Sequence, residues 1–414
     1  MKKQINVGVV GCGYWGPNLV RNFRSISACN MKIICDLNEG RLNHVRSLYP
    51  EVETETEFKR LVDNPDIDAV VVATSVRMHF EMAKACLLAG KHVLIEKPMA
   101  ASVGECEELI AIAQTHGLVL MVGHTFLYSS AVRKIKEIVD NRDIGDLRYI
   151  SSRRLNLGLF QKDINVAWDL APHDISIILH IMQEMPLSVN CRGAAHITDG
   201  IEDVTSMNLH FTKERSAIVH SSWHDPRKVR EMTIVGSKRM IVYDDISSQE
   251  KIKIYDVRVE RPPHYDTLAE FHYAYHYGDI YSPYIKQDEP LKTECLHFID
   301  CIKDGLVPLT SGRSGLDVVR ILEASSSSLK EKGAPIEVFA EAENVRRGDN
   351  AKSAKQIILG VAGRSTEINS SEILHHPDDI VMKQGQKIGR SPDKRGEKNS
   401  AVHDVRSMNS SQLL

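Results

Sequence analysis

The sequence predicts an α/β domain with a doubly wound parallel sheet, followed by an α+β domain. Two observations predict this class. In the first part of the chain, short β-branched runs alternate with segments of helix-like spacing, and from about residue 147 onward strand-like runs follow one another with turn signals between them. Alternating strands and helices are typical of a parallel sheet, whereas strands joined by turns are typical of a mainly antiparallel sheet.

Five short apolar runs are the expected strands of the first domain. They read INVGVVG, MKIICD, DAVVVAT, KHVLIE and LVLMVG. Helix-like spacing of apolar residues occupies the segments between and after them, which are residues 18–27, 41–48, 57–62, 80–89 and 105–115. We therefore assign residues 1–124 to the parallel sheet and its helices.

Residues 125–340 form the expected second domain. A helix at about 131–139 precedes the strand-like run LRYISSRRLNL and the helix WDLAPHDISIILHIM. The strand-like runs that follow are SVNCRGAAHI, DVTSMNLHF, SAIVHSSW, VREMTIVG, RMIVYDD and KIKIYD. Two helices, at about 292–303 and 316–330, are expected to close this domain. Residues 341–414 contain no aromatic residue and no cysteine, so we expect a disordered tail or the remnant of a linker.

Composition limits the class of function. The 414 residues are enough for two domains, and a net charge of −3 provides no electrostatic reason to expect nucleic acid or membrane lipid as a partner. No apolar run approaches the roughly 20 residues that cross a bilayer. The eight cysteines form no CxxC pair, so we expect reduced thiols and a cytoplasmic location. Small molecules and other proteins are the expected partners.

The first chemical motif is GxGxxG, which Gly11, Gly13 and Gly16 form directly after the first expected strand. In this context Gly11 permits a tight turn, Gly13 lets the backbone approach a pyrophosphate, and Gly16 allows a helix to pack closely on the strand. The N-terminus of that helix offers free N–H groups to phosphates. We predict dinucleotide binding, with a plain glycine turn as the alternative. The predicted loop also contains Cys12, Tyr14 and Trp15.

Asp36 ends the second expected strand, twenty positions after Gly16 (36 − 16). A carboxylate at this place accepts the hydroxyls of an adenosine ribose and repels a 2′-phosphate, so NAD is favoured over NADP. Arg41 lies close enough in sequence to keep NADP open. A helix cap before residues 37–39 is the alternative role for Asp36.

The second motif is HVLIEKP, residues 92–98. A buried strand delivers Glu96 and Lys97 to the carboxyl edge of the sheet, where open α/β sheets bind ligands. The expected strand DAVVVAT ends at the same edge of the sheet, which makes Thr74, Ser75 and His79 candidate cofactor contacts. His124, after the last expected strand, is a candidate of the same kind. For both His79 and His124 the alternative is a buried histidine of the core with its hydrogen bonds satisfied.

These motifs resemble the glucose-fructose oxidoreductase and inositol dehydrogenase family, called Gfo/Idh/MocA. The resemblance spans about residues 4–340 and rests on GCGYWG, Asp36, DAVVVATSVRMHFEMAKACLLAGKHVLIEKPMA, VGHTFLY and WDLAPHD. It implies a Rossmann domain, a C-terminal domain with a large open-faced sheet that often builds dimers or tetramers, and hydride exchange between a nicotinamide cofactor and a sugar or cyclitol hydroxyl. It also implies that Lys97, Asp169 and His173 are catalytic. Ser75 and Pro172 depart from the family pattern.

The segment WDLAPHD places Asp169 and His173 four residues apart, with Pro172 between them. If Asp169 is the N-cap, Pro172 falls in the first helical turn, where its missing N–H costs little. The spacing then places Asp169 and His173 on one helix face. We predict that His173 exchanges the substrate proton, that Asp169 orients the imidazole, and that Lys97 stabilises a developing alkoxide. The alternative is a simple cap and a polar first-turn histidine.

Further polar residues are candidates for substrate binding. Arg153, Arg154 and Asn156 suit a carboxylate or a nucleotide-sugar phosphate, or they form a solvated strand face. In FHYAYHYGD the alternation predicts a strand with Phe271, Tyr273, Tyr275 and Tyr277 on one face, an expected active-site wall, and His272 and His276 on the other. We expect no metal site there or elsewhere. SSWHDPRK, around Trp223, is expected to serve packing or a subunit contact.

The expected function is therefore NAD-dependent oxidation or reduction at a secondary hydroxyl of a sugar, nucleotide sugar or cyclitol, in a homodimer or homotetramer. Two alternatives stay open. One is a regulator that holds NAD without catalysis, and the other is a lyase or glycosidase that uses NAD transiently within each turnover.

Overall fold

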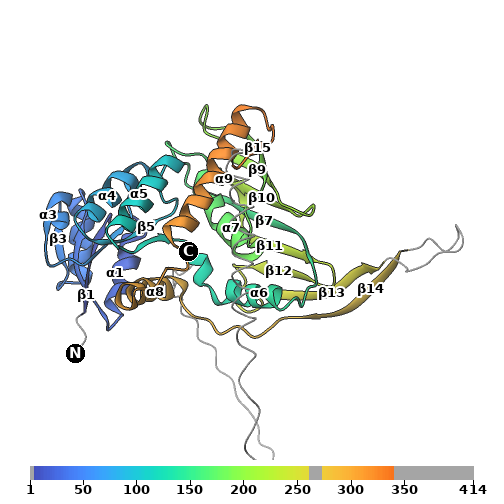
Figure 1. The fold of residues 1–414 in the computed structure, drawn as a ribbon, viewed down its shortest axis with the longest axis horizontal. Coiled ribbons are helices and arrows are strands. Elements are labelled where there is room, and N and C mark those ends of the chain that lie inside the picture. Colours follow the sequence, from blue (N-terminus) through green and yellow to red (C-terminus); the bar gives the residue numbers. More distant parts are fainter. Residues whose placement is uncertain (1–3, 261–272, 340–414) are drawn as a thin grey trace, which may run out of the picture. The chain divides into compact units, whose positions relative to one another are not determined.

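A computed structural model describes residues 4–260 and 273–339. Six parallel strands form the first sheet, in the order β3-β2-β1-β4-β5-β6 (Figure 1). They are β1 (Ile5–Val10), β2 (Cys29–Cys35), β3 (Glu53–Glu55), β4 (Ala69–Val72), β5 (His92–Glu96) and β6 (Leu120–Gly123). The doubly wound parallel sheet is confirmed. Because β2 and β4 lie on opposite sides of β1, the strand order reverses there, which is the place where open α/β sheets bind ligands at the carboxyl ends of their strands.

Helices cover both faces of this sheet. They are α1 (Gly16–Arg24), α2 (Glu39–Leu48), α3 (Phe58–Asp63), α4 (Val76–Leu88) and α5 (Val103–Thr115). Alternate residues of β4 belong to different apolar clusters, with Val71 on one face and Val70 and Val72 on the other. Burial on both faces explains why the strand reads as an unbroken apolar run rather than an alternating one.

Nine strands form the second sheet, in the order β14-β13-β12-β11-β7-β10-β9-β8-β15. Every pair is antiparallel except β7 with β10, so the mainly antiparallel sheet is confirmed. The strands are β7 (Leu147–Leu157), β8 (Ser188–Ala194), β9 (Val204–His210), β10 (Ser216–Ser222), β11 (His224–Gly236), β12 (Met240–Asp244), β13 (Ile252–Glu260), β14 (Ala274–Tyr281) and β15 (Ile336–Glu337).

One face of the second sheet packs against helices and the other is open. The 3₁₀ helix η1 (Thr125–Tyr128) and helices α6 (Ser130–Asp140) and α7 (Val166–Met182) contribute to the buried side. Ile150 and Ala217 point into this core, whereas Tyr149 and Ile218 are 41% and 38% exposed on the opposite face. The open-faced sheet that the family resemblance implies is therefore present.

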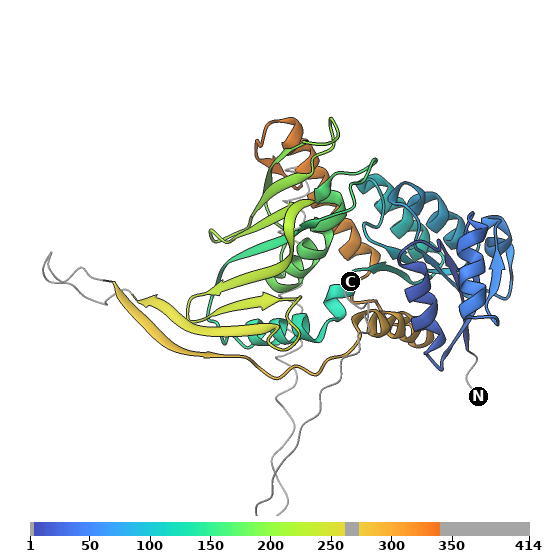
Figure 2. The ribbon, with the colours of Figure 1, turned by 180° about the vertical axis from the view of Figure 1, so that it is seen from behind.

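Helix α8 (Pro290–Asp304) and the helix after it, which lie between β14 and β15 in sequence, pack against the first sheet. Leu291, Phe298 and Ile299, in α8, share an apolar cluster with β1, and Phe298 meets Phe23 of α1 edge to face. Both ribbon views show α8 beside α1 (Figure 2). The expectation that α8 closes the second domain is therefore wrong: its apolar stripe fits the uncovered edge of the first core.

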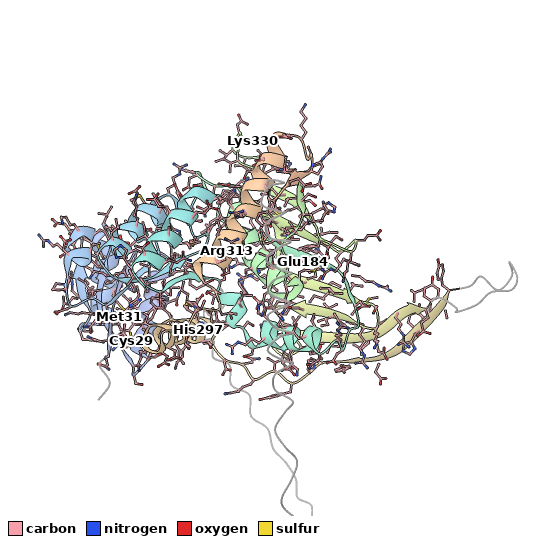
Figure 3. All side chains as sticks on the ribbon, in the orientation of Figure 1. Cys29, Met31, Glu184, His297, Arg313 and Lys330 are labelled. Atoms are coloured by element: carbon pink, nitrogen blue, oxygen red, sulfur yellow. The ribbon has the colours of Figure 1, made fainter. Side chains whose placement is uncertain are left out.

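Helix α9 (Gly312–Lys330) runs between the two sheets, and Figure 3 labels Arg313 and Lys330 near its ends. Leu316 and Val319 pack against the first sheet, while Ile321 and Leu322 pack against the second. This double contact joins the two halves of the described chain. In the part of the chain that the structure describes, no helix combines the length and apolarity needed to span a membrane. The expected tail, 341–414, lies outside the described residues.

Candidate active site

The glycine loop after β1 leaves room that side chains would fill. Gly11 has φ +98°, and a Cβ on it would lie 2.4 Å from the carbonyl oxygen of Ala73. A Cβ on Gly16 would lie 2.4 Å from the carbonyl oxygen of Gly11, so α1 packs closely on the strand only with glycine here. A Cβ on Gly13 would meet nothing within 4 Å. This open backbone at a helix N-terminus fits a pyrophosphate.

Other residues of this loop frame the crevice. Trp15 precedes the first residue of α1, and its ring meets Tyr14 edge to face with centroids 5.6 Å apart. Tyr14 is 66% exposed, whereas Cys12 is buried. Two rings next to an open glycine backbone provide apolar surface beside the expected phosphate position.

Asp36 lies at the carboxyl end of β2 and holds the glycine loop. Its Oδ2 accepts a hydrogen bond from the backbone N–H of Cys12 at 2.6 Å, and its Oδ1 accepts one from the N–H of Asn38 at 2.8 Å. Arg41 Nη1 lies 3.6 Å from Oδ2. The cap of α2 is Asn38 rather than Asp36, because the Asn38 side chain accepts the N–H of Arg41. Asp36 is thus free of the capping role and faces the loop.

The loops after β4 and β5 are tied together by His79. Its Nδ1 lies 2.8 Å from the carbonyl oxygen of Pro98, and its Nε2 lies 3.1 Å from that of Thr74. The ring is buried, and burial lowers its pKa. A neutral imidazole has one N–H, so His79 donates a hydrogen bond to one of these carbonyl oxygens and lies next to the other, and it contacts both loops. Ser75, which follows Thr74 in sequence, precedes the first turn of α4.

Glu96 ends β5 and Lys97 follows it at the same edge, as the sequence predicts. Burial raises the pKa of the Glu96 carboxyl to about 7, and the charge of Lys97 offsets part of that rise. The Lys97 ammonium donates a hydrogen bond to the backbone carbonyl oxygen of Asp169 at 2.7 Å and lies 3.7 Å from Asp169 Oδ1. A lysine of the first sheet thus meets the first turns of α7.

Helix α7 begins earlier than the sequence analysis predicts. Asn165 is its N-cap, and the Asn165 side chain accepts the N–H of Trp168 at 3.1 Å. Asp169 is therefore inside the helix, and the prediction that it is the cap is wrong. Pro172 lies beyond the first turn, in the helix interior, where it has no N–H to donate to the carbonyl of Trp168.

The Asp169 carboxylate contacts two groups, neither of which is His173. Trp223 Nε1 donates a hydrogen bond to Asp169 Oδ2 at 3.0 Å, while Lys97 approaches Oδ1. Nδ1 of His173 is buried without a hydrogen-bond partner. The predicted Asp169–His173 contact is therefore not made in this structure, although both side chains come from the same part of α7. Asp169 positions the Lys97 ammonium instead.

His173 lies among aromatic and cationic groups. The His173 ring meets the Phe126 ring edge to face, with centroids 5.0 Å apart. The Arg154 guanidinium lies 4.7 Å from the centroid of the Phe126 ring. Burial lowers the pKa of His173 well below its ordinary value, and the charges of Lys97 and Arg154 lower it further. His173 is therefore neutral at physiological pH, which is the form that accepts a proton.

His124 is a second neutral imidazole near Lys97. Neither of its ring nitrogens has a hydrogen-bond partner, and the residue is 1% exposed. Burial, with the charge of Lys97, lowers its pKa to about 4. His124 lines a cavity of about 360 Å³ together with residues of η1, α7 and α9.

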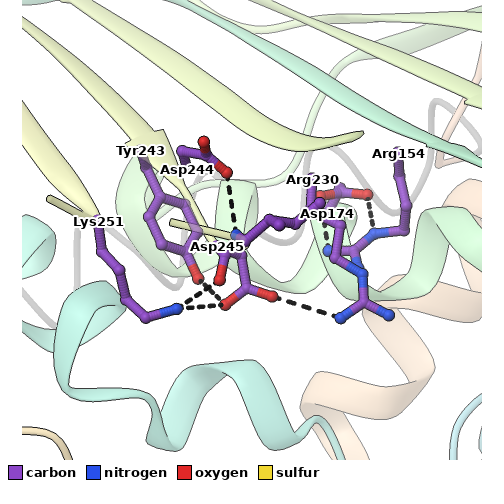
Figure 4. A network of polar contacts seen from close by, with 8 residues as sticks. Arg154, Asp174, Arg230, Tyr243, Asp244, Asp245 and Lys251 are labelled. Atoms are coloured by element: carbon purple, nitrogen blue, oxygen red, sulfur yellow. Dashed lines mark hydrogen bonds and ion pairs between the residues drawn. The ribbon is translucent and has the colours of Figure 1, made fainter. Parts of the chain in front are cut away.

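Arg153 and Arg154 point to opposite faces of the second sheet. Arg154 donates to both carboxylate oxygens of Asp174 in α7, at 2.7 and 3.1 Å, and this pair is buried. Figure 4 shows the pair beside the Arg230–Asp245 contact. Arg153 lies on the open face, 4.0 Å from Glu231. Strand alternation places Asn156 on the side of Arg154.

The structure does not bring Tyr277 to this site within one chain. It is 78% exposed on β14, an edge strand that lies four positions from β7 in the strand order, or roughly 19 Å at a spacing of about 4.8 Å. The expectation that Tyr277 lines an active site therefore stays a prediction. The segment is a strand as predicted, while Phe271 and His272 lie outside the described residues.

Two site residues escaped the sequence analysis. Trp223 was expected to serve packing or a subunit contact, yet its buried indole reaches Asp169, and a Cβ on Gly158 would lie 2.6 Å from its Cδ1. Glu294 reaches the site from α8 and accepts a hydrogen bond from Thr125 Oγ1 at 2.7 Å. Burial raises the pKa of Glu294 well above its ordinary value, with the charge of Glu96 adding to this. The sequence signal that could have revealed Glu294 is its position as an acidic residue on the apolar face of α8.

Comparisons with known proteins show the family to which the chain is similar. The family described as oxidoreductase family, NAD-binding Rossmann fold, matches residues 5–124, and the GFO/IDH/MocA C-terminal domain matches residues 132–242. An uncharacterized oxidoreductase, YrbE of Bacillus subtilis, is 26% identical over 82% of this chain and 98% of its own. Myo-inositol 2-dehydrogenase of Thermotoga maritima is 25% identical over 79% and 97%. Aldose-aldose oxidoreductase of Caulobacter crescentus has the same fold, with a TM-score of 0.69, 20% identity, and coverage of 81% and 100%.

Proposed function

Because the chain belongs to the Gfo/Idh/MocA family of oxidoreductases, we propose that it transfers a hydride between NAD and a secondary hydroxyl of a sugar, nucleotide sugar or cyclitol. The contact between Lys97, which follows β5, and Asp169 of α7 carries this proposal, since it joins a charged donor at the carboxyl edge of the first sheet to the helix that contains His173. The relative named myo-inositol 2-dehydrogenase supports the substrate class.

The residues of the crevice fit a dinucleotide. The loop of Gly11, Gly13 and Gly16 would hold the pyrophosphate, and Asp36 would accept the adenosine ribose hydroxyls. NAD is the preferred cofactor in this proposal because a 2′-phosphate would meet the Asp36 carboxylate, although Arg41 stands nearby. When bound, the nicotinamide ring supplies the acceptor or donor of the hydride.

Three side chains of this chain handle the substrate hydroxyl in our proposal. Neutral His173 takes the hydroxyl proton during oxidation and returns it during reduction. Lys97 donates a hydrogen bond to the same oxygen and stabilises its developing negative charge. Asp169, held by Trp223, fixes the position of the Lys97 ammonium. Arg154, paired with Asp174, adds positive charge close to His173 without being free to move.

Assembly and location are part of the same proposal. The open sheet face, with Tyr149 and Ile218 exposed, supports a subunit interface in a homodimer or homotetramer. The eight cysteines are buried free thiols, which supports work in a reducing compartment, the cytoplasm.

A substrate panel tests the proposed function. Purified protein is incubated with free sugars, cyclitols and UDP-sugars, with NAD or NADP, and both NADH absorbance and product formation are followed. We expect net NADH formation with at least one secondary alcohol, and a loss of kcat of about 10²–10⁴ in His173→Ala with little change in NAD affinity. His116→Ala, an exposed histidine variant, is the control.

Three results would contradict the proposal. A product formed without net NADH indicates transient use of the cofactor, as in a lyase or glycosidase. Tight NAD binding without turnover of any compound in either direction indicates a regulator. An unchanged kcat in His173→Ala removes this histidine from the proton transfer.

A further inference from the structure

A second cluster of chemically reactive side chains lies at one end of the second sheet, outside the set that the proposed function uses. It consists of His196, in the loop after β8, Asp203, just before β9, and His224, the first residue of β11. One ligand atom from each residue lies within 4.8 Å of the others. Three segments that are distant in sequence therefore converge on a single point.

The Asp203 carboxylate is held in place by the backbone. Its Oδ2 accepts hydrogen bonds from the N–H groups of His196 at 2.7 Å and Ile197 at 3.0 Å. The backbone of Asp203 donates to Ala194 and accepts from Trp223, both at 2.9 Å. These bonds fix the side chain, which is 1% exposed, and they leave Oδ1 to the imidazole of His196. The carboxylate is thus preorganised.

The two imidazoles approach this carboxylate from different sides. Nδ1 of His196 lies 2.7 Å from Oδ1, and Nε2 of His224 lies 3.5 Å from Oδ2. The His196 ring and the His224 ring are edge to face, with centroids 5.6 Å apart. Their side chains are 58% and 34% exposed, so solvent reaches the point where the three ligand atoms meet.

The donor set selects a class of ion. Two imidazoles and one carboxylate match the ligands of zinc and related divalent transition metals, whereas magnesium and calcium prefer oxygen ligands throughout. The Asp203 carboxylate supplies the oxygen ligand of this set. One negative charge then neutralises half of the charge of a divalent ion.

We propose that His196, Asp203 and His224 bind one divalent transition-metal ion of the zinc class, with solvent in the remaining coordination position. Two of the three ligands flank the backbone hydrogen bond between Asp203 and Trp223. A bound ion would therefore fix the backbone at Trp223, whose indole holds the Asp169 carboxylate. The ion is a positioning element in this view, and the hydride chemistry does not pass through it.

Metal binding by the full, untagged chain tests the proposal. Protein treated with a chelator and dialysed is titrated with Zn²⁺ by calorimetry, and with Co²⁺ by visible absorption, which reports coordination geometry. We expect one ion per chain and a cobalt spectrum with imidazole ligands. Replacement of a residue that only hydrogen-bonds to a metal ligand lowers metal affinity by about 10- to 100-fold. Since His196→Gln and His224→Gln each remove a ligand, zinc affinity is expected to fall by more than about tenfold in either variant.

Controls separate this site from the other histidines, since the chain has 18 of them. His116→Gln, on the first domain, is expected to keep both stoichiometry and affinity. His196 is exposed, so its replacement is compatible with folding even where a variant of buried Asp203 is not. Absence of a bound ion in the full chain, or equal zinc binding by the His196→Gln/His224→Gln double variant, would overturn the proposal. Neither result bears on NADH formation, so the proposed function is judged separately.

Discussion

Replacement of Lys97 by alanine probes the junction of the two sheets most directly. The ammonium lies 2.7 Å from the Asp169 carbonyl oxygen, and in our proposal it also donates to the substrate oxygen. Removal of one charged donor from a site of this kind lowers kcat by about 10²–10³, equivalent to roughly 2.7–4 kcal/mol. Since the donor acts on charge that develops during the reaction, kcat should fall more than KM rises.

The same substitution changes the titration of His173. Burial lowers the pKa of His173, and the positive charge of Lys97 is the next largest cause. Without that charge the pKa of His173 rises toward its ordinary value, so the imidazole becomes protonated at a higher pH. The protonated ring accepts no proton, and the acid limb of the pH profile for alcohol oxidation should therefore move to higher pH in Lys97→Ala.

Initial rates of NADH formation, measured across the pH range in which imidazoles titrate, give both quantities. Lys97→Arg keeps the charge and should leave the acid limb near its wild-type position even if kcat falls. Lys59→Ala, which removes a lysine in an exposed pair with Asp63, is the control. A wild-type kcat in Lys97→Ala, or an acid limb displaced to lower pH, would refute the reasoning.

Three further substitutions test separate parts of the structure. Burial lowers the pKa of His124 from 6.5 to about 4, so the unfolded chain binds the proton more tightly than the folded chain does. The free energy of unfolding of the wild-type protein should therefore fall by about 3 kcal/mol as the pH decreases from 6.5 to about 4. His124→Phe should remove this part of the pH dependence in urea unfolding, and an unchanged slope contradicts the assignment. Asp36→Ala should weaken NAD binding more than NADP binding in fluorescence titrations, because Arg41 then lacks its carboxylate neighbour; a uniform loss contradicts a ribose contact. Arg154→Met leaves Asp174 buried without its partner and should lower the free energy of unfolding by about 3–5 kcal/mol, whereas Arg154→Met/Asp174→Leu should recover most of it.

Motifs in which each residue has its own steric or electrostatic reason were predictable from sequence. Gly11 and Gly16 are needed because a Cβ would collide with backbone, and Asp36 follows a strand that ends at the crevice. Such constraints are local, so the order of residues along the chain is enough to recognise them. The strand and helix alternation of the first domain was predictable for the same reason.

The start of α7 and the pairing of Asp169 were not predicted correctly. Pro172 suggested a helix beginning at Asp169, but Asn165, four residues earlier, provides a side-chain cap. The bond from Trp223 to Asp169 joins residues 54 positions apart, and no periodicity within either segment indicates it. The opposite directions of Arg153 and Arg154 were available from strand alternation alone.

The packing of α8 has a consequence for how the protein is made. The first sheet is complete in sequence at Gly123, yet the apolar cluster beneath β1 is filled by residues up to Ile299, which are synthesised 176 positions later (299 − 123). At about 5–20 residues per second, a ribosome needs roughly 10–35 s to cover that distance. During this interval the apolar side chains of the first domain that α8 later covers remain exposed to solvent.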